Sequence, residues 1–338
     1  MARGQELEAW LRAGDYPRSE PDQLLGSSAV AKASANLGRS AVRPGRPRAA
    51  SASQQRLRTL PRARGELDLL QLRDPFLGFE DLLLPDHHAK IFAELQLELQ
   101  KEDFLVRHGV APRRTLLFTG PPGCGKSATA EALARELDRE FAVVNLSTVV
   151  SSFLGDTSKN LSSIFEAASR EPWVVLFDEF DAIGKERAER TDHGELKRVV
   201  TAFLQQLDNF LGPSILVAAT NHPDLVDSAV WRRFSIVLQF DPPSVHELRD
   251  LMRLKLRSIK RESGFNVEAA ASACKGLTQA EVSQVVEDSY RSHLLHDARR
   301  PLTLDELIAA ADAAQRRNQI ATNGRERASF ANPGPATA

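Results

Sequence analysis

One stretch decides the fold of this chain: Gly120-Pro121-Pro122-Gly123-Cys124-Gly125-Lys126-Ser127. It follows the apolar run Thr115-Leu116-Leu117-Phe118, which is typical of a buried strand. After it, small and apolar residues recur at helical spacing between Ala128 and Leu137. A glycine-rich turn that joins a strand end to a helix N-terminus presents free backbone N–H groups to an anion. The stretch therefore predicts a phosphate-binding loop.

The residue types in this loop suit the phosphates of a nucleotide. The three glycines allow the backbone to curl with its amides pointing inward, and Lys126 can reach the β- and γ-phosphates. Ser127 can offer its hydroxyl to Mg²⁺. We assign nucleotide binding to the whole of this segment, Gly120, Pro121, Pro122, Gly123, Cys124, Gly125, Lys126, Ser127 and Ala128. Cys124 fills a position that accepts any small residue.

A second apolar run ends in two successive carboxylates. Trp173-Val174-Val175-Leu176-Phe177 predicts a buried strand, and Asp178 and Glu179 follow it directly. At this place Asp178 would hold Mg²⁺ through water, and Glu179 would orient and polarise the water that attacks the γ-phosphate. The predicted activity is therefore nucleotide hydrolysis as well as binding.

Three motifs, in this order and spacing, resemble those of the AAA+ ATPases, in particular the AAA clade of hexameric protein remodellers. They are GPPGCGKS, VVLFDEFDAIG and AATNHPDLVDSAVWRRF, and the resemblance covers roughly residues 75–315. It implies ATP and Mg²⁺ as cofactors, a homo-hexamer, and a protein substrate. No His-Glu-x-x-His zinc motif follows the predicted ATPase domain, so any proteolysis is expected to come from another chain, and an adaptor is a further possible partner.

The resemblance implies catalytic roles for residues further along the chain. Asn221, at the end of the predicted strand 215–220, matches the polar residue that helps to position the attacking water. Arg232 and Arg233 match the arginine fingers, which act on the nucleotide of a neighbouring subunit. The two arginines are adjacent here and Ser235 replaces the usual Asp, so which arginine dominates is left open.

Two further segments match parts of the family that handle substrate and signalling. Phe153-Leu154-Gly155 resembles the aromatic-aliphatic-glycine pore loop that grips a polypeptide. Asp208-Asn209-Phe210 lies where relatives carry an Asp-Gly-Phe motif that signals between subunits, with Asn in place of Gly.

The predicted fold is an α/β domain with a small helical domain after it. Apolar runs predict five strands at about 114–119, 141–145, 173–177, 215–220 and 235–240, and their alternation with helical segments predicts a parallel sheet covered on both faces. We place this large domain at residues 75–241. Three Ser/Thr-x-x-Glu capping boxes, beginning at Ser244, Thr278 and Thr303, predict a small helical domain at residues 242–318. The resemblance implies that this domain forms a lid over the nucleotide.

The two ends of the chain have a different composition. Residues 1–26 are a candidate docking element with a short amphipathic helix, and residues 27–74 read as a basic linker rich in Arg, Pro, Ser and Ala. Residues 1–64 contain twelve basic and five acidic side chains, a net charge of +7. This basic N-terminal region is expected to be mostly disordered, and so is the tail at 319–338.

Two functions from different classes follow from these features. The first is an ATP-driven motor that remodels, unfolds or threads a protein through a hexameric pore. The alternative is a nucleic-acid-associated ATP switch or loader that uses the basic N-terminal arm. No apolar run is long enough for a membrane span and no export signal is evident, so a soluble cytoplasmic protein is expected.

Overall fold

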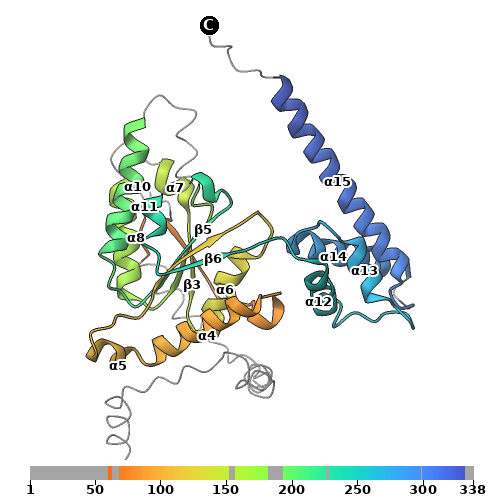
Figure 1. Cartoon of the computed structure of the whole chain (residues 1–338), viewed down its shortest axis with the longest axis horizontal. Coiled ribbons are helices and arrows are strands. Elements are labelled where there is room, and N and C mark those ends of the chain that lie inside the picture. The colour runs from red at the N-terminus through yellow and green to blue at the C-terminus, as the bar shows by residue number, and fades with distance from the viewer. Residues whose placement is uncertain are drawn as a thin grey trace, which may run out of the picture. The chain divides into compact units, whose positions relative to one another are not determined.

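The structure, a computed structural model, describes residues 60–62, 68–151, 157–181, 193–225, 228–297 and 299–331. These residues form an α/β part and a helical part (Figure 1). The described strands make one sheet in the order β1-β3-β4-β5-β2-β6. They are β1 (Leu70–Arg73), β2 (Thr115–Thr119), β3 (Phe141–Val144), β4 (Val174–Phe177), β5 (Ile215–Thr220) and β6 (Ile236–Gln239).

Helices precede, connect and follow these strands. Those of the α/β part are η1 (Phe79–Asp81), α4 (Asp86–Gln100), α5 (Glu102–Arg107), α6 (Lys126–Glu136), α7 (Leu146–Ser151), α8 (Thr157–Arg170), α10 (His193–Asp208), η2 (Pro223–Leu225) and α11 (Ser228–Trp231). Those of the helical part are α12 (Val245–Lys255), α13 (Val267–Ala273), α14 (Gln279–Asp297) and α15 (Leu304–Ala331).

The central strands are buried on both faces, which explains why they read as continuous apolar runs. Val175 and Phe177 of β4 pack in the cluster that contains Ile164 of α8 and Phe203 of α10. Val174 and Leu176, which point to the other face, pack in the cluster that contains Phe92 of α4 and Leu133 of α6. Two helical layers therefore cover the sheet, as predicted.

Strand pairing brings the carboxyl ends of three strands to one edge of the sheet. β2 pairs in parallel with β5, where Thr119 lies opposite Thr220, and β5 pairs in parallel with β4, where Phe177 lies opposite Ala218. In open α/β sheets, ligands bind at this edge. The residues that follow β2, β4 and β5 are those to which the sequence assigns the nucleotide site.

The sheet has one more strand than the sequence predicts. All five predicted strands are present, and β1 pairs antiparallel to β3, with Leu70 opposite Val144. β1 lies inside the segment predicted to be a linker, and its four residues are too few for periodicity to reveal a strand. Leu70 of β1 and Leu69 just before it are buried in the core. They reach the core because β1 pairs with β3.

The helical part has its own core, formed by buried apolar residues from all four of its helices. Three of its helices, α12, α14 and α15, begin at the predicted capping boxes. At the first, the Glu247 backbone N–H donates to Ser244 Oγ at 3.3 Å, and the Ser244 N–H donates to Glu247 Oε2 at 2.8 Å. The fourth helix, α13, was not predicted and begins after Asn266, whose side chain accepts from the Ala269 N–H. α15 continues to Ala331, beyond the predicted lid boundary at residue 318.

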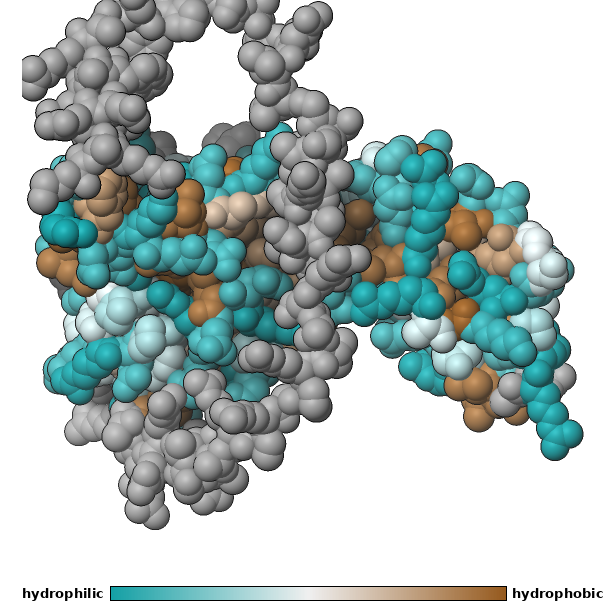
Figure 2. All heavy atoms as spheres, turned by 90° about the horizontal axis from the view of Figure 1, so that it is seen from below, coloured by the Kyte–Doolittle hydropathy of each residue, from teal (hydrophilic) through white to brown (hydrophobic). Residues whose placement is uncertain are grey.

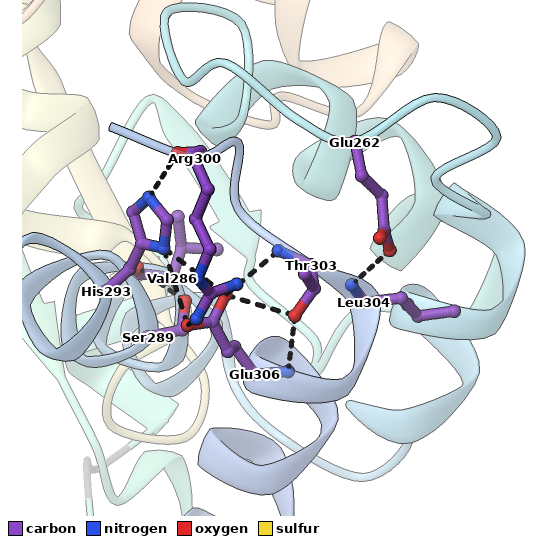
Figure 3. A network of polar contacts seen from close by, with 8 residues as sticks. All are labelled: Glu262, Val286, Ser289, His293, Arg300, Thr303, Leu304 and Glu306. Carbon is purple, nitrogen blue, oxygen red and sulfur yellow. Dashed lines mark hydrogen bonds and ion pairs between the residues drawn. The ribbon is translucent and has the colours of Figure 1, made fainter. Parts of the chain in front are cut away.

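The third capping box belongs to a polar network beside this core (Figure 3). The Thr303 N–H donates to Glu306 Oε2 at 3.0 Å, and His293 Nε2 donates to the Arg300 carbonyl oxygen at 2.9 Å. Burial opposes ionisation of Glu306, but hydrogen bonds from Thr303, Arg300 and His293 outweigh this effect and lower the pKa of its carboxyl to about 2. The network therefore holds α14 against the start of α15.

Candidate nucleotide site

The phosphate loop occupies residues 120–125, between the end of β2 and the start of α6. Gly125 is the residue before the first turn of α6 and has a left-handed backbone with φ of 96°. Gly120 has φ of 136°, and a Cβ placed on it would lie 2.0 Å from the carbonyl oxygen of Phe240. A side chain at position 120 is thus excluded both by backbone conformation and by contact with the residue that follows β6.

Lys126 is buried at the start of α6, with 6% of its surface exposed. Its Nζ donates to the carbonyl oxygens of Gly120 at 2.6 Å and Pro121 at 2.8 Å, so the side chain folds back over the loop. Burial lowers the pKa of Lys126, while the nearby carboxylates of Asp178 and Asp181 oppose that effect. A phosphate oxygen is a stronger partner for an ammonium group than a carbonyl oxygen.

The two residues predicted to hold Mg²⁺ are brought together although 51 positions separate them. Ser127 Oγ donates to Asp178 Oδ2 at 2.6 Å. A hydroxyl and a carboxylate, each fixed at the end of a regular element beside a phosphate loop, are oxygen donors of the type that Mg²⁺ prefers. This donor set fits Mg²⁺.

Glu179 is exposed beside this pair and adopts an unusual backbone conformation. Its φ is 51°, one of two positive values among the described residues other than glycine, and its N–H donates to Asp178 Oδ1 at 2.9 Å. Such conformations are strained for residues with a Cβ and concentrate at functional sites. The turn leaves Glu179 exposed to solvent, next to Asp178, which contacts Ser127 at the start of α6.

Asn221 follows β5 at the same edge and is half-buried. Its backbone N–H donates to Asp181 Oδ1 at 3.2 Å. Asp181 itself is 4% exposed and was not singled out from the sequence, although it stands two residues after Glu179. Its place in the sequence, shortly after the apolar strand and the Asp178-Glu179 pair, is the signal that could have identified it as a site residue.

Arg232 and Arg233 lie at the other end of β2 from the phosphate loop. They precede Ser235, whose backbone N–H donates to the carbonyl oxygen of Thr115, the first residue of β2, at 3.0 Å. β2 and β6 run parallel, so the five residues of β2, about 16 Å of strand, separate the arginines from the loop of the same chain. Neither side chain is long enough to cross that distance.

The structure distinguishes between the two arginines. Arg233 Nε donates to both carboxylate oxygens of Asp208, at 3.0 and 2.8 Å, and Asp208 is the last residue of α10. Arg232 is exposed and has no side-chain partner among the residues that the structure describes. Arg233 is therefore held in its own chain, whereas Arg232 is available to another molecule.

Other predicted residues lie outside the described residues. These are Phe153-Leu154-Gly155, the candidate docking element at 1–26 and most of the basic linker. On the face shown in Figure 2, apolar side chains of the described surface are interspersed with polar ones. None of the helices within the described residues combines the length and apolar character needed to cross a bilayer.

Comparisons with known proteins agree with this geometry. Residues 116–242 match the model of the ATPase family associated with various cellular activities (AAA). An uncharacterised AAA family ATPase of Sinorhizobium fredii is 31% identical over 325 residues, which are 94% of this chain and 97% of the relative. The chain belongs to the AAA ATPase family. This AAA protein accordingly binds nucleotide and hydrolyses ATP, as the sequence predicts.

More distant relatives carry a functional name. A proteasome-activating nucleotidase of Sulfurisphaera tokodaii is 29% identical over 237 residues, which are 68% of this chain and 60% of the relative. One of Saccharolobus islandicus is 31% identical over 224 residues, 64% of this chain and 56% of the relative. The AAA chain thus spans about three fifths of these nucleotidases.

Proposed function

We propose that this AAA ATPase is a homo-hexameric motor that couples ATP hydrolysis to the remodelling, unfolding or threading of a protein. The main support for a ring-shaped assembly is the position of Arg232 and Arg233. They lie at the opposite end of β2 from the phosphate loop of their own chain. A site that needs these guanidinium groups must receive them from a neighbouring subunit. Hydrolysis therefore depends on assembly.

Within one subunit, each residue of the site has a distinct role in the proposed reaction. Lys126 and the loop amides bind the phosphates, and Ser127 and Asp178 would hold Mg²⁺, which neutralises charge on the phosphate oxygens. Glu179 orients and polarises the attacking water, and Asn221 positions it. The exposed turn at Glu179 allows a water molecule to reach the carboxylate.

We assign the finger role to Arg232 and a positioning role to Arg233. The Arg233–Asp208 ion pair ties the short segment after α11 to the end of α10. Arg232 is adjacent to it and free of partners among the described residues, so it can contact the phosphates of the next subunit. A guanidinium supplied in this way stabilises the charge of the transition state.

Support for a protein substrate comes from the relatives and from the sequence. The relatives from Sulfurisphaera tokodaii and Saccharolobus islandicus described above are named proteasome-activating nucleotidases, and Phe153-Leu154-Gly155 resembles the family's pore loop. An exposed aromatic grips many side chains without reading a sequence. An adaptor or a separate protease would then select or degrade the substrate.

A mixing experiment tests the ring. Glu179→Gln removes the proposed base but leaves Arg232, whereas Arg232→Ala removes the finger but leaves the base. Each variant alone is expected to lose ATP turnover by about 10³-fold. When the two are mixed, turnover should reappear, because the intact site of an Arg232→Ala subunit receives a finger from its neighbour.

Two controls accompany the mixture. Each variant assembled by itself must stay inactive, and Arg107→Ala, which removes an exposed arginine on α5, should keep full turnover. Full turnover by Arg232→Ala alone, or no recovery in the mixture, would show that the finger does not act between subunits. Unchanged substrate processing by Phe153→Ala would remove the threading step.

A further inference from the structure

Asp181 is a third carboxylate at the end of the sheet where Asp178 and Glu179 lie. It follows β4 by four positions and is 4% exposed. Carboxylates are rarely buried to this extent unless specific groups compensate for the lost hydration. The reaction proposed above gives roles to Asp178 and Glu179 but none to Asp181.

Two groups that donate hydrogen bonds to Asp181 lie at the end of β5. Its Oδ1 accepts from the hydroxyl of Thr220 at 3.3 Å and from the backbone N–H of Asn221 at 3.2 Å. Thr220, the last residue of β5, is fully buried, and its Oγ1 in turn accepts from the His222 N–H at 3.1 Å. One carboxylate oxygen thus holds the turn in which the chain leaves β5.

The same carboxylate belongs to the turn that carries Glu179. The Phe180 N–H donates to the Ala219 carbonyl oxygen at 2.8 Å, so the chain returns to β5 immediately after Glu179. Glu179, with φ of 51°, is therefore held between Asp178 on one side and the Phe180 and Asp181 contacts on the other. Strained turns persist only where surrounding contacts determine them.

We infer that Asp181 is a positioning residue that fixes Asn221 relative to Glu179, so that both act on the same attacking water. This inference rests on the proposed function, which gives those two residues their roles. Misplacing a group at a reacting centre by about 1 Å can lower the rate about 100-fold. In this scheme Asp181 touches neither nucleotide nor water, and its effect on the reaction passes through the turn at Asn221.

Two substitutions of Asp181 test whether its role depends on accepting these hydrogen bonds. Asp181→Asn keeps a carbonyl oxygen that can accept from Thr220 and Asn221, whereas Asp181→Ala removes the acceptor. We expect Asp181→Ala to lower kcat about 100-fold while the Kd for a fluorescent ATP analogue stays within about threefold. Asp181→Asn should recover kcat to within about tenfold of the wild-type value.

Ser214 offers a matched control at the opposite edge of the sheet. It is fully buried, its Oγ accepts from the Trp173 N–H at 3.0 Å, and it thereby joins the starts of β4 and β5 as Asp181 joins their ends. Ser214→Ala should lower the thermal stability but leave kcat unchanged. An equal loss of kcat in Ser214→Ala would show that any loosening of these two strands has the same effect, and would overturn the inference.

A double-mutant cycle with Asn221→Ala provides the decisive measurement. If Asp181 acts through Asn221, Asp181→Asn and Asp181→Ala should have little further effect on kcat in the Asn221→Ala background. Multiplicative losses, or wild-type kcat in Asp181→Ala, would overturn the inference. If Asp181→Ala does not fold, the cycle is completed with Asp181→Asn and Thr220→Val, which removes one hydrogen bond to the carboxylate.

Failure of the proposed function has a different signature. A wild-type chain without ATPase activity, or a Glu179→Gln variant as active as wild type, would contradict the reaction itself. An inactive Glu179→Gln beside a fully active Asp181→Ala would overturn only the role of Asp181.

Discussion

Replacing Gly120 with alanine tests whether the phosphate loop is shaped by contact with the end of β6. The added Cβ would lie 2.0 Å from the Phe240 carbonyl oxygen, and real Cβ atoms essentially never approach within 3.0 Å. The loop and residue 240 would therefore have to separate by at least 1.0 Å, the difference of these two distances. The backbone at φ of 136° adds conformational strain of about 1–3 kcal/mol.

Gly109 offers the matched control. It also has a positive φ, 77°, but a Cβ there would meet no atom within 4 Å. Gly109→Ala should therefore lower the free energy of unfolding by only about 1 kcal/mol. For Gly120→Ala we expect a loss of about 3 kcal/mol or more, because steric overlap adds about 1–3 kcal/mol to the strain.

Urea unfolding followed by circular dichroism measures these losses, and steady-state ATPase assays measure the effect on the site. A 1 Å displacement of the loop should lower turnover about 100-fold in Gly120→Ala and leave Gly109→Ala at the wild-type rate. Equal destabilisation of the two variants, with normal turnover in both, would refute the claim that the Phe240 contact shapes the loop.

Three further predictions concern charge and metal binding. Lys126→Met should abolish ATP binding, yet leave the unliganded protein at least as stable as wild type in urea unfolding, because burial of the ammonium is unfavourable; marked destabilisation would contradict this. Ser127→Ala should require about tenfold more Mg²⁺ for half-maximal turnover, and an unchanged Mg²⁺ titration would exclude the hydroxyl as a ligand. The ionised Glu306 carboxylate stabilises the protein above its unfolded pKa of 4.5, and this contribution is lost as the pH falls toward its folded pKa of about 2. Glu306→Gln should therefore lower the free energy of unfolding by on the order of 2 kcal/mol near neutral pH, with the difference from wild type closing between pH 4.5 and 2; a pH-independent difference would argue against the network in Figure 3.

Local features of the fold could be predicted because short segments carry their signals. The phosphate loop, the apolar strands and the capping box at Ser244 each depend on residues within a few positions of one another. β1 could not be predicted, because its four residues become a strand only when they pair with β3. The extension of α15 to Ala331 was also missed, since its composition suggests a polar tail.

The sequence by itself determined that this chain has a nucleotide loop followed by paired carboxylates on an α/β sheet. Only the tertiary structure decided which distant residues share the site. It placed Ser127 within hydrogen-bond distance of Asp178, and Asp181 within hydrogen-bond distance of the Asn221 N–H, because parallel pairing of β4, β5 and β2 brings their carboxyl ends to one end of the sheet. The same pairing leaves Arg232 at the far end of β2, since a residue that precedes a parallel strand lies at the opposite edge from one that follows it.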